Sequence, residues 1–320
     1  MARQGDEAWR AMPDQDGKVT VVTGANTGLG FEATRAFAHK GAHVVMACRD
    51  TDKAADARHD IEREGPRGSL EVATLDLADL ESVEAFAEEF RTDHEDLHVL
   101  CNNAGVMAIP RSETADGFET QFGVNHLGHF ALTGRLFDRL RETPGETRVI
   151  TQSSGLHENG DIDFADLQGE RSYDPWDAYA QSKLANVLFA YELDRRLRAA
   201  GVADVASVAC HPGYAATDLQ RRGPEKSGST VRLWAMKAAN AVLAQSAEKG
   251  ALPMLYAATA DAVDGGDYVG PGGFRNMRGL PEIQASSDRS YDRDLAARLW
   301  EVSEDLTGAR YDLEAAPTAE

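Results

Sequence analysis

The stretch that most constrains the fold lies near the start of the chain, where a β-branched run leads directly into a glycine-rich turn. Lys18 to Thr23 reads as a short buried parallel strand, and Gly24, Gly28 and Gly30 follow with the spacing Gly-x-x-x-Gly-x-Gly. A helical pattern then continues to about residue 38. A strand, a glycine turn and a helix in this order place a pyrophosphate at a helix N-terminus. The turn could be purely structural, and its spacing departs from the usual fingerprint, but the two flanking elements favour a dinucleotide-binding site.

The rest of the chain alternates between strand-like runs and helical segments, which is typical of a parallel α/β sheet. Further strands are expected at about residues 43–48, 69–75, 97–101, 148–154, 203–210 and 267–269. Long helices are expected at about 114–141 and 176–199. The sequence therefore predicts one domain over residues 1–320, a doubly wound Rossmann fold with seven parallel strands and helices on both faces of the sheet.

Three segments fall outside this pattern. Residues 1–16 form a polar N-terminal extension without the apolar run of a secretory signal, and residues 317–320 are expected to be a flexible tail. Residues 227–245 have an amphipathic helical pattern. The region at about 218–250 could be a substrate lid, an interface or part of the core, and we expect a lid.

The end of the second strand bears on which dinucleotide binds. An acidic residue there would bond the ribose hydroxyls of NAD, but Cys48 occupies that place and Arg49 follows it. Arginine can pair with the 2′-phosphate of NADP, so NADP is the preferred cofactor and NAD the alternative. The neighbouring Asp50 weakens this argument, and Arg49 could also be an ordinary solvated surface residue. Asp76, just past the third strand, could accept a hydrogen bond from the adenine amino group or cap the next helix.

Tyr179 and Lys183 are four residues apart in a helical segment, so their side chains share one face of the helix, one turn apart. An ammonium beside a phenol favours the phenolate, and the pair therefore predicts a lowered pKa for Tyr179. Such a tyrosine can give or take a proton at a carbonyl or an alcohol. Tyrosine and lysine at this spacing are common on solvated helices, and it is the accompanying cofactor motif that favours a chemical role.

Other polar residues follow or interrupt apolar runs. The sequence Asn102 to Gly105 ends the fourth strand, where small residues let the chain pass close to a cofactor. Asn125 stands inside an apolar helical stretch and needs a partner if it is buried, which suggests that it holds a water molecule or a backbone kink. His126 and His129 have no carboxylate or cysteine nearby in the sequence, so we predict packing roles for them and no metal site.

The charge balance argues against one class of partner. Asp and Glu total 53 against 33 Lys and Arg, which gives a formal net charge of −20 and would repel nucleic acid. Lysine is scarce among the basic residues. The chain could be an ordinary acidic soluble protein, but acid enrichment together with lysine depletion favours a salt-rich cytoplasm, in which the self-repulsion is screened.

Cysteine usage and hydropathy indicate where the protein resides. No apolar run reaches the length of about 18 residues that a membrane span needs. Cys48, Cys101 and Cys210 each end an apolar run, and an odd number in such places predicts reduced core thiols and a cytoplasmic protein. Apolar helix faces around Leu132 and Leu188 could pair in a homodimer or pack internally.

Taken together, the motifs resemble those of the short-chain dehydrogenase/reductases over about residues 17–280. The stretches that carry the resemblance are Thr23 to Gly30, Asn102 to Gly105, Asn125, Ser154, Tyr179 to Lys183 and Pro212-Gly213. Residues 124–130, 182–187 and 211–213 look like the retinol dehydrogenase branch of this family. The resemblance implies hydride transfer between a nicotinamide dinucleotide and a small alcohol, aldehyde or ketone, which we expect to be apolar.

The resemblance also implies roles for individual residues. The catalytic tetrad would be Asn125, Ser154, Tyr179 and Lys183, with Tyr179 as the general acid in reduction and the base in oxidation. Lys183 would hold the nicotinamide ribose, and Asn125 would anchor a relay water. Ser154, chosen over Ser153 as the second serine of the pair, would bond the substrate oxygen. Cofactor contacts are implied for Gly24, Asn26, Thr27, Gly28, Leu29, Gly30, Arg49, Asp76, Leu77, Asn103, Ala104, Gly105, Tyr179, Lys183, Pro212, Gly213 and Thr217.

Two other functions are open to this sequence. Residues 266–277 look similar to the light-dependent protochlorophyllide reductases, and NADPH-dependent turnover of simple aldehydes in darkness would separate the two enzyme classes. A dinucleotide sensor without turnover could keep the same fold, although all four catalytic positions are filled here. Cofactor binding without activity on a broad carbonyl panel would favour the sensor.

Overall fold

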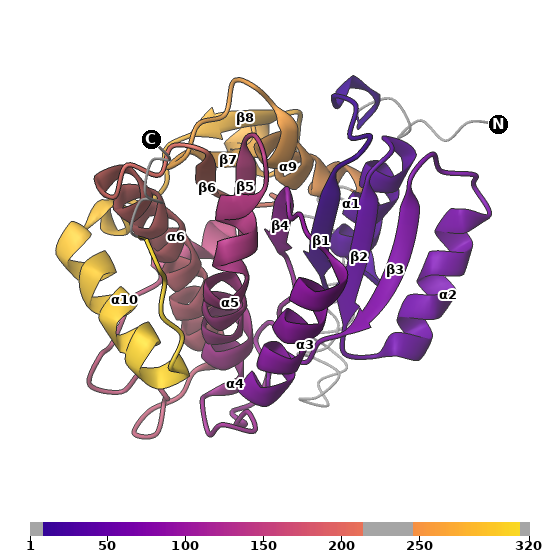
Figure 1. Cartoon of the computed structure of the whole chain (residues 1–320). Helices are drawn as coiled ribbons and strands as arrows, with labels where there is room; N and C mark the ends of the chain where they lie inside the picture. Colours follow the sequence, from indigo (N-terminus) through magenta and orange to yellow (C-terminus); the bar gives the residue numbers. More distant parts are fainter. Residues whose placement is uncertain (1–8, 214–245, 314–320) are drawn as a thin grey trace, which may run out of the picture.

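Eight strands form one sheet in the parts of the chain that the computed structural model describes, residues 9–213 and 246–313 (Figure 1). Their order in the sheet is β3-β2-β1-β4-β5-β6-β7-β8, and all neighbours are parallel except β7 and β8. The strands are β1 (Val19–Thr23), β2 (His43–Cys48), β3 (Ser69–Thr74), β4 (Val99–Asn102), β5 (Thr147–Gln152), β6 (Val205–Cys210), β7 (Tyr268–Pro271) and β8 (Pro281–Gln284). This order confirms the predicted doubly wound Rossmann fold.

The predicted count of seven parallel strands is wrong by one antiparallel edge strand. β8 pairs with β7 through Tyr268 and Gln284 at one end and Pro271 and Pro281 at the other. The strand is only four residues long, its sequence Pro-Glu-Ile-Gln lacks an apolar run, and none of its residues is buried. Pairing with the neighbouring edge, and not local sequence pattern, makes this segment a strand.

Helices cover both faces of the sheet because successive strand residues point to opposite sides. On one face, α1 (Gly28–His39), α2 (Thr51–Glu62) and α9 (Ala247–Thr259) share a core with Val22 of β1. On the other, α3 (Leu80–Asp93), α5 (Gly128–Glu142) and α6 (Pro175–Ala199) share a core with Val21. Outside α5 and α6 lies α10 (Arg293–Thr307), at the outer left in Figure 1. The shorter helical segments are η1 (Trp9–Ala11), α4 (Thr120–Phe122), η2 (Gly123–Leu127), η3 (Gly155–Asn159), η4 (Phe274–Asn276) and η5 (Asp288–Tyr291).

The helix predicted at 114–141 is shorter and less regular than expected. Thr114 lies in the turn between Glu113 and Glu119, which form a β-bridge, and the helical part begins only at Thr120. Residues Gly123–Leu127 then form a π-helical turn before α5. A π-turn replaces the regular backbone ladder locally and is frequent at functional sites.

Several predictions about packing are decided by burial. Cys48, Cys101 and Cys210 are buried and unpaired, as predicted. Leu132 and Leu188 are fully buried in two core clusters of the same chain, so they pack internally. In the described ranges, no helix is long and apolar enough to cross a membrane.

Some predictions concern residues outside the described ranges. These are Thr217, the helix at 227–245, most of the hypothesised lid at 218–250, the first half of the N-terminal extension and the tail at 317–320. Of the hypothesised lid, residues 246–250 are described: Ser246 is the N-cap of α9, and residues 247–250 form its first turn.

The strand order fixes where a ligand can bind. β1 pairs with β2 on one side and with β4 on the other, so the order of the sheet reverses between β1 and β4. In open parallel sheets the carboxyl ends of the strands at such a switch point form the ligand crevice. The residues that follow β1, β4 and β5 therefore meet at one edge of the sheet.

Candidate active site

The glycine turn after β1 has the conformation that its sequence predicts. Gly24 has φ +65° and its N–H donates to the carbonyl of Ala47 at the end of β2, 2.9 Å away. Gly28, with φ +58°, opens α1. A side chain at Gly30 would collide with the Gly24 carbonyl, so only glycine lets α1 approach the turn so closely. The first amides of α1 thus face the crevice, where a helix N-terminus favours an anion.

A buried hydroxyl ties this turn to the segment after β4. Thr23 Oγ1 accepts hydrogen bonds from the backbone N–H groups of Asn103 and Ala104, each at 2.9 Å. The Asn103 side chain donates to the Thr23 carbonyl at 2.8 Å. An asparagine amide thus joins the ends of the neighbouring strands β1 and β4.

His129 completes this connection from α5. Its Nδ1 lies 3.0 Å from the Asn125 carbonyl, which can only accept, so Nδ1 carries the proton and Nε2 accepts from Thr23 Oγ1 at 2.9 Å. Burial lowers the pKa of His129 to about 4 and keeps the ring neutral. His126 is likewise buried, with its pKa lowered to about 3 by burial and its Nε2 2.8 Å from Ser303 Oγ. Both histidines are packing residues, as predicted. His129 also links the π-turn at Asn125 to Thr23, just before the glycine turn.

Tyr179 lies near the start of α6, which begins in the way its sequence dictates. The Asp174 carboxylate accepts from the Trp176 and Asp177 amides, and Pro175 occupies the first turn. Tyr179 is buried, and burial raises its pKa to about 12, while a hydrogen bond with the Ser154 side chain acts in the lowering direction. The predicted lowering of the pKa is therefore wrong for this structure, because burial dominates.

The two serines at the end of β5 have different partners. Ser153 is buried and its hydroxyl donates to the Lys183 carbonyl at 2.7 Å. Ser154 is only partly buried, accepts from the Leu156 amide at 3.2 Å and bonds with Tyr179. Only Ser154 therefore presents its hydroxyl beside the phenol.

Lys183 lies one turn along α6 from Tyr179, and its side chain is buried as well. Its Nζ donates to the Gln152 carbonyl at 3.1 Å and lies 5.7 Å from the centroid of the Tyr179 ring. Burial lowers the pKa of Lys183 to about 8. The ammonium is thus bonded at the end of β5, one helix turn from the phenol, while burial is the dominant influence on the Tyr179 pKa. An ammonium has three donors, and among the described residues Lys183 Nζ uses one of them on Gln152, so it can hold further hydroxyl groups.

Asn125 occupies the π-turn and uses its side chain within the protein. Its Oδ1 accepts from the Val106 amide at 2.8 Å, and its Nδ2 donates to the Val106 carbonyl and to Ser182 Oγ, both at 2.9 Å. The residue therefore joins the segment after β4 to α6, next to Lys183. The predicted local backbone irregularity is present, and the hypothesis of a relay water stays a prediction.

The end of β2 carries the groups expected to distinguish the two dinucleotides. The Arg49 side chain is 70% exposed, and its guanidinium lies 4.0 Å from the Asp76 carboxylate. Asp50 instead caps α2 by accepting from the Lys53 amide at 3.1 Å and pairs with the Lys53 ammonium. Cys48 lies beneath the glycine turn, with its pKa raised to about 11 by burial against opposing backbone hydrogen bonds from Ala25 and Asn26.

Asp76 and Leu77, the two predicted cofactor contacts after β3, also make contacts within the protein. Asp76 does not cap α3, because Asp79 does so by accepting from the Glu81 amide at 3.0 Å. Asp76 accepts instead from the Ala78 amide at 3.0 Å. The Leu77 side chain is buried in the core, so any cofactor contact that it makes would be through its main chain.

The last predicted contacts follow β6. Gly213 has φ +64°, and a side chain there would collide with the Met277 carbonyl. The Gly213 amide also lies 3.3 Å from His211 Nδ1. Pro212 and Gly213 thus begin the segment that leads out of the described range toward Thr217.

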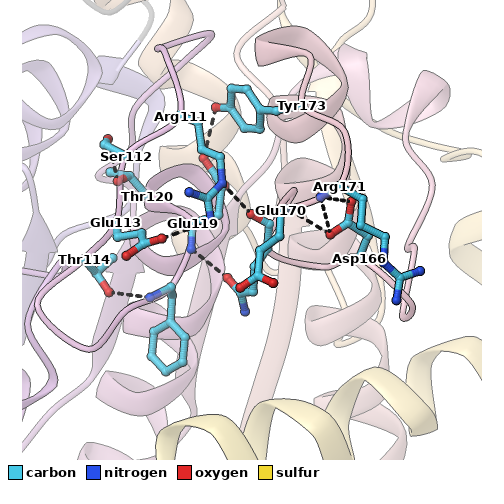
Figure 2. A network of polar contacts seen from close by, with 12 residues as sticks. Arg111, Ser112, Glu113, Thr114, Glu119, Thr120, Asp166, Glu170, Arg171 and Tyr173 are labelled. Atoms are coloured by element: carbon cyan, nitrogen blue, oxygen red, sulfur yellow. Dashed lines mark hydrogen bonds and ion pairs between the residues drawn. The ribbon is translucent and has the colours of Figure 1, made fainter.

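A polar network holds the loop that leads to α6 (Figure 2). The buried Glu119 carboxylate accepts from the Gln121 and Phe122 amides at 2.9 and 2.7 Å, and the Tyr173 hydroxyl lies 3.1 Å away. Burial raises the pKa of Glu119. Asp166, farther along the loop, accepts from the Glu170 amide at 2.8 Å. The network fixes the loop just before the cap of α6 and so fixes the position of Tyr179.

These residues fit a nicotinamide dinucleotide. Gly28 and Gly30 carry no side chain at the start of α1, and a Cβ at Gly105 would lie 3.6 Å from Lys183 Nζ and 2.9 Å from Asn125 Oδ1. A phosphate group at α1 and ribose hydroxyls at the buried ammonium match the donors that are present. The fold and the site together define a dinucleotide-binding oxidoreductase.

Comparison with known proteins gives the family. A family model described as "short chain dehydrogenase" matches residues 18–228. The chain is 42% identical to human (Homo sapiens) retinol dehydrogenase 12 over 298 residues, which covers 92% of this chain and 88% of that protein. It is 39% identical to mouse (Mus musculus) polyprenol dehydrogenase over 313 residues, covering 96% and 88% of the two chains. The protein belongs to the short-chain dehydrogenase family and is similar to its retinol dehydrogenases, so it is an oxidoreductase of CH–OH and C=O groups.

Solved structures agree with this assignment. A crystal structure of an uncharacterized protein from Mycobacterium paratuberculosis is 40% identical, with a TM-score of 0.77 and coverage of 95% of this chain and 98% of that one. An NADP-bound structure from Beutenbergia cavernae, described as an NAD(P)-dependent gluconate 5-dehydrogenase, is 27% identical with a TM-score of 0.60, covering 78% and 92%. The fold expected from the resemblance is confirmed.

Three residues that support the site were missed by sequence reasoning. Thr23 and His129 form the buried link described above. His157 Nε2 accepts a hydrogen bond from the Ser287 amide, 3.1 Å away. The proton of the neutral ring is therefore on Nδ1, which donates to the Ser154 carbonyl at 2.7 Å. Only the four-residue spacing of Asn125 and His129 within one helical stretch could have suggested any of these contacts.

Proposed function

We propose that the protein interconverts an apolar alcohol and its aldehyde or ketone with NADP(H), and that Tyr179 is the general acid and base. The observation that carries this proposal is the meeting of the Tyr179 hydroxyl, the Ser154 hydroxyl and the buried Lys183 ammonium at the switch point of the sheet. When bound, the dinucleotide would supply or accept the hydride at its nicotinamide ring.

The protonation states suit the reductive direction. A phenol with a pKa of about 12 keeps its proton at neutral pH and can donate it to the oxygen of a carbonyl that is being reduced. Ser154 would bond the same oxygen and orient it. Lys183, with a pKa of about 8, is still mostly an ammonium at pH 7 and would stabilise the phenolate that remains after the transfer.

Removal of the phenol oxygen tests the mechanism. Tyr179→Phe is expected to lower kcat about 10²–10⁴-fold while NADPH binding, followed by protein fluorescence, is retained. Tyr191→Phe is the matched control, since Tyr191 lies on the same helix and its hydroxyl contacts Ser286. Near-wild-type reduction of a carbonyl panel by Tyr179→Phe, read as loss of the NADPH absorbance band, would refute the proposal.

The preference for NADP rests on Arg49. Loss of one charge-assisted contact of about 1.5–3 kcal/mol corresponds to about a 10- to 150-fold fall in kcat/KM for NADPH. Arg49→Ala should show this fall and leave kcat/KM for NADH nearly unchanged. Arg63→Ala is the control, because Arg63 pairs with Asp60 at the far end of α2. An unchanged ratio of the two kcat/KM values in Arg49→Ala would exclude this role.

The substrate class is supported by the relatives. Retinol and polyprenol dehydrogenases are named for long apolar primary alcohols, and we propose substrates of this kind, tested as the aldehydes against short water-soluble ones. We further propose a cytoplasmic location, which is supported by three buried cysteines without disulfides.

A further inference from the structure

A second cluster of chemically active side chains lies away from the candidate active site. His43 is the first residue of β2, Glu71 lies within β3, and His94 is the C-cap residue of α3. His43 Nε2 and His94 Nε2 lie 3.2 and 3.3 Å from the same carboxylate oxygen, Glu71 Oε2. Within the described residues, this is the only group of three or more His, Cys, Asp or Glu side chains whose ligand atoms all lie within 4.8 Å of one another.

The sheet register explains why these side chains meet. His43 pairs with Ser69 on β3, and Glu71 is two residues further along that strand, so all three point to the same face. Val45, two residues along β2 from His43, packs in the core that contains residues of α3, so this is the face that α3 covers. His94, at the end of α3, is thereby brought over His43, with ring centroids 5.3 Å apart.

The geometry points to a site for a divalent transition metal, and we propose that His43, Glu71 and His94 bind Zn²⁺. Ligand atoms about 2.0–2.1 Å from a tetrahedral zinc ion lie about 3.3–3.4 Å from one another. The two nitrogen–oxygen distances in the cluster, 3.2 and 3.3 Å, match this spacing. Two imidazoles and a carboxylate are a ligand set that zinc accepts, and a water molecule can take the fourth position.

Two further features support a built site. Ser69 Oγ lies 2.7 Å from His43 Nδ1, which leaves Nε2 directed at the cluster, as the outer partners of zinc-binding histidines do. The side chains of His43, Glu71 and His94 are 29%, 40% and 13% exposed, so an ion can enter from solvent while the protein still fixes its ligands. Without an ion, the same contacts would be an ordinary pair of histidines sharing one carboxylate.

The location predicts a role in stability. His43 and Glu71 lie toward the amino ends of parallel strands, and the crevice lies at their carboxyl ends. The ion would join β2, β3 and α3 at the end of β2 opposite to Arg49, and therefore away from the candidate cofactor site. Zinc is therefore expected to raise the melting temperature in proportion to ln(1 + [Zn²⁺]/Kd) without entering the reaction.

Zinc titration of the chelator-treated full-length protein tests the proposal. Wild type should bind one equivalent by calorimetry and show a rise in Tm, whereas His94→Gln and Glu71→Gln should each bind at least about tenfold more weakly. His39→Gln is the matched control, because His39 pairs with Glu64 at 3.0 Å without a second imidazole. Mg²⁺ at equal concentration controls for attraction to the net charge of −20.

Two results would overturn the site. One is equal zinc affinity in wild type, His94→Gln and Glu71→Gln, provided that the variants melt like wild type in chelator. The other is a Co²⁺ complex whose spectrum carries thiolate charge-transfer bands, which would place the ion at one of the cysteines. A tetrahedral Co²⁺ spectrum without these bands, lost in His43→Gln, is the expected outcome.

Discussion

The stability of the folded protein should depend on pH through Lys183, and Lys183→Met should reveal this dependence. Lys183 is buried, and burial lowers its pKa from 10.5 to about 8. At about 1.4 kcal/mol per pH unit, the charged lysine costs the folded state about 3 kcal/mol at neutral pH. Lys183→Met removes this cost and also the hydrogen bond to Gln152, so we expect a net gain of about 2 kcal/mol at pH 7.

The gain should disappear as the pH rises. Between about pH 8 and 10.5 the unfolded chain keeps a lysine proton that the folded chain has lost, so the free energy of unfolding of wild type rises with pH. Tyr179 acts in the opposite direction above its unfolded value of 10.0, because its folded pKa is about 12. Burial also raises the pKa values of Cys101 and Cys210, so only the difference between variant and wild type isolates the lysine.

Urea unfolding of both proteins from about pH 7 to about pH 10 measures this difference. Lys249→Met is the control, since Lys249 is exposed near the start of α9 and its removal should give a curve parallel to that of wild type. A constant difference between Lys183→Met and wild type across the range would refute the reasoning, because it would mean that the ammonium is not desolvated in the folded state.

Three further predictions concern other parts of the molecule. Ser154→Ala should lower kcat about 10²-fold in steady-state assays, whereas Ser153→Ala should lose about 1 kcal/mol of unfolding free energy in urea and keep its kcat. His129→Leu leaves the Asn125 carbonyl and the Thr23 hydroxyl without their imidazole partner, so it should lower the free energy of unfolding by about 1–3 kcal/mol and raise the KM for the cofactor. His129→Gln should recover part of both losses, and equal behaviour of the two variants would contradict this role. If the net charge of −20 reflects a salt-rich cytoplasm, Tm should rise from dilute buffer to molar KCl, and a flat response would exclude the idea.

The parts of the fold that are set by local pattern could be predicted from the sequence. The β-branched run before Gly24 and the apolar runs of the later strands gave the parallel sheet, because a strand covered on both faces must be apolar throughout. β8 could not be predicted, since its polar sequence becomes a strand only by pairing with the edge at β7. The π-turn at 123–127 was anticipated only as a possible backbone kink at Asn125, because the bonds from its side chain to Val106 and Ser182 have no local sequence signal.

The candidate site divides in the same way. Residues of the glycine turn, the segment after β4, Asn125, Tyr179 and Lys183 were named from sequence motifs, and they do meet at one edge of the sheet. The sense of the Tyr179 pKa shift was mispredicted, since helical spacing gives the separation of two side chains along the helix but not the desolvation of the phenol or the direction of the ammonium. His157 and Thr23 escaped notice because each acts through a contact more than 75 residues away in sequence, and a single chain has no local signal for such a contact.

Around the candidate site, the hydrogen bonds within the protein separate supporting groups from groups left for chemistry. Thr23, Asn125 and Ser153 use their side chains on protein partners, whereas Tyr179 and Ser154 bond chiefly with each other. The same burial that raises the Tyr179 pKa to about 12 lowers that of Lys183 to about 8. The two groups can therefore be protonated together only below about pH 8. In the proposed reduction, activity would then fall at higher pH because Lys183 loses its proton, while Tyr179 still carries the proton that it donates. Lys183 rather than Tyr179 would therefore set the alkaline limit of the enzyme.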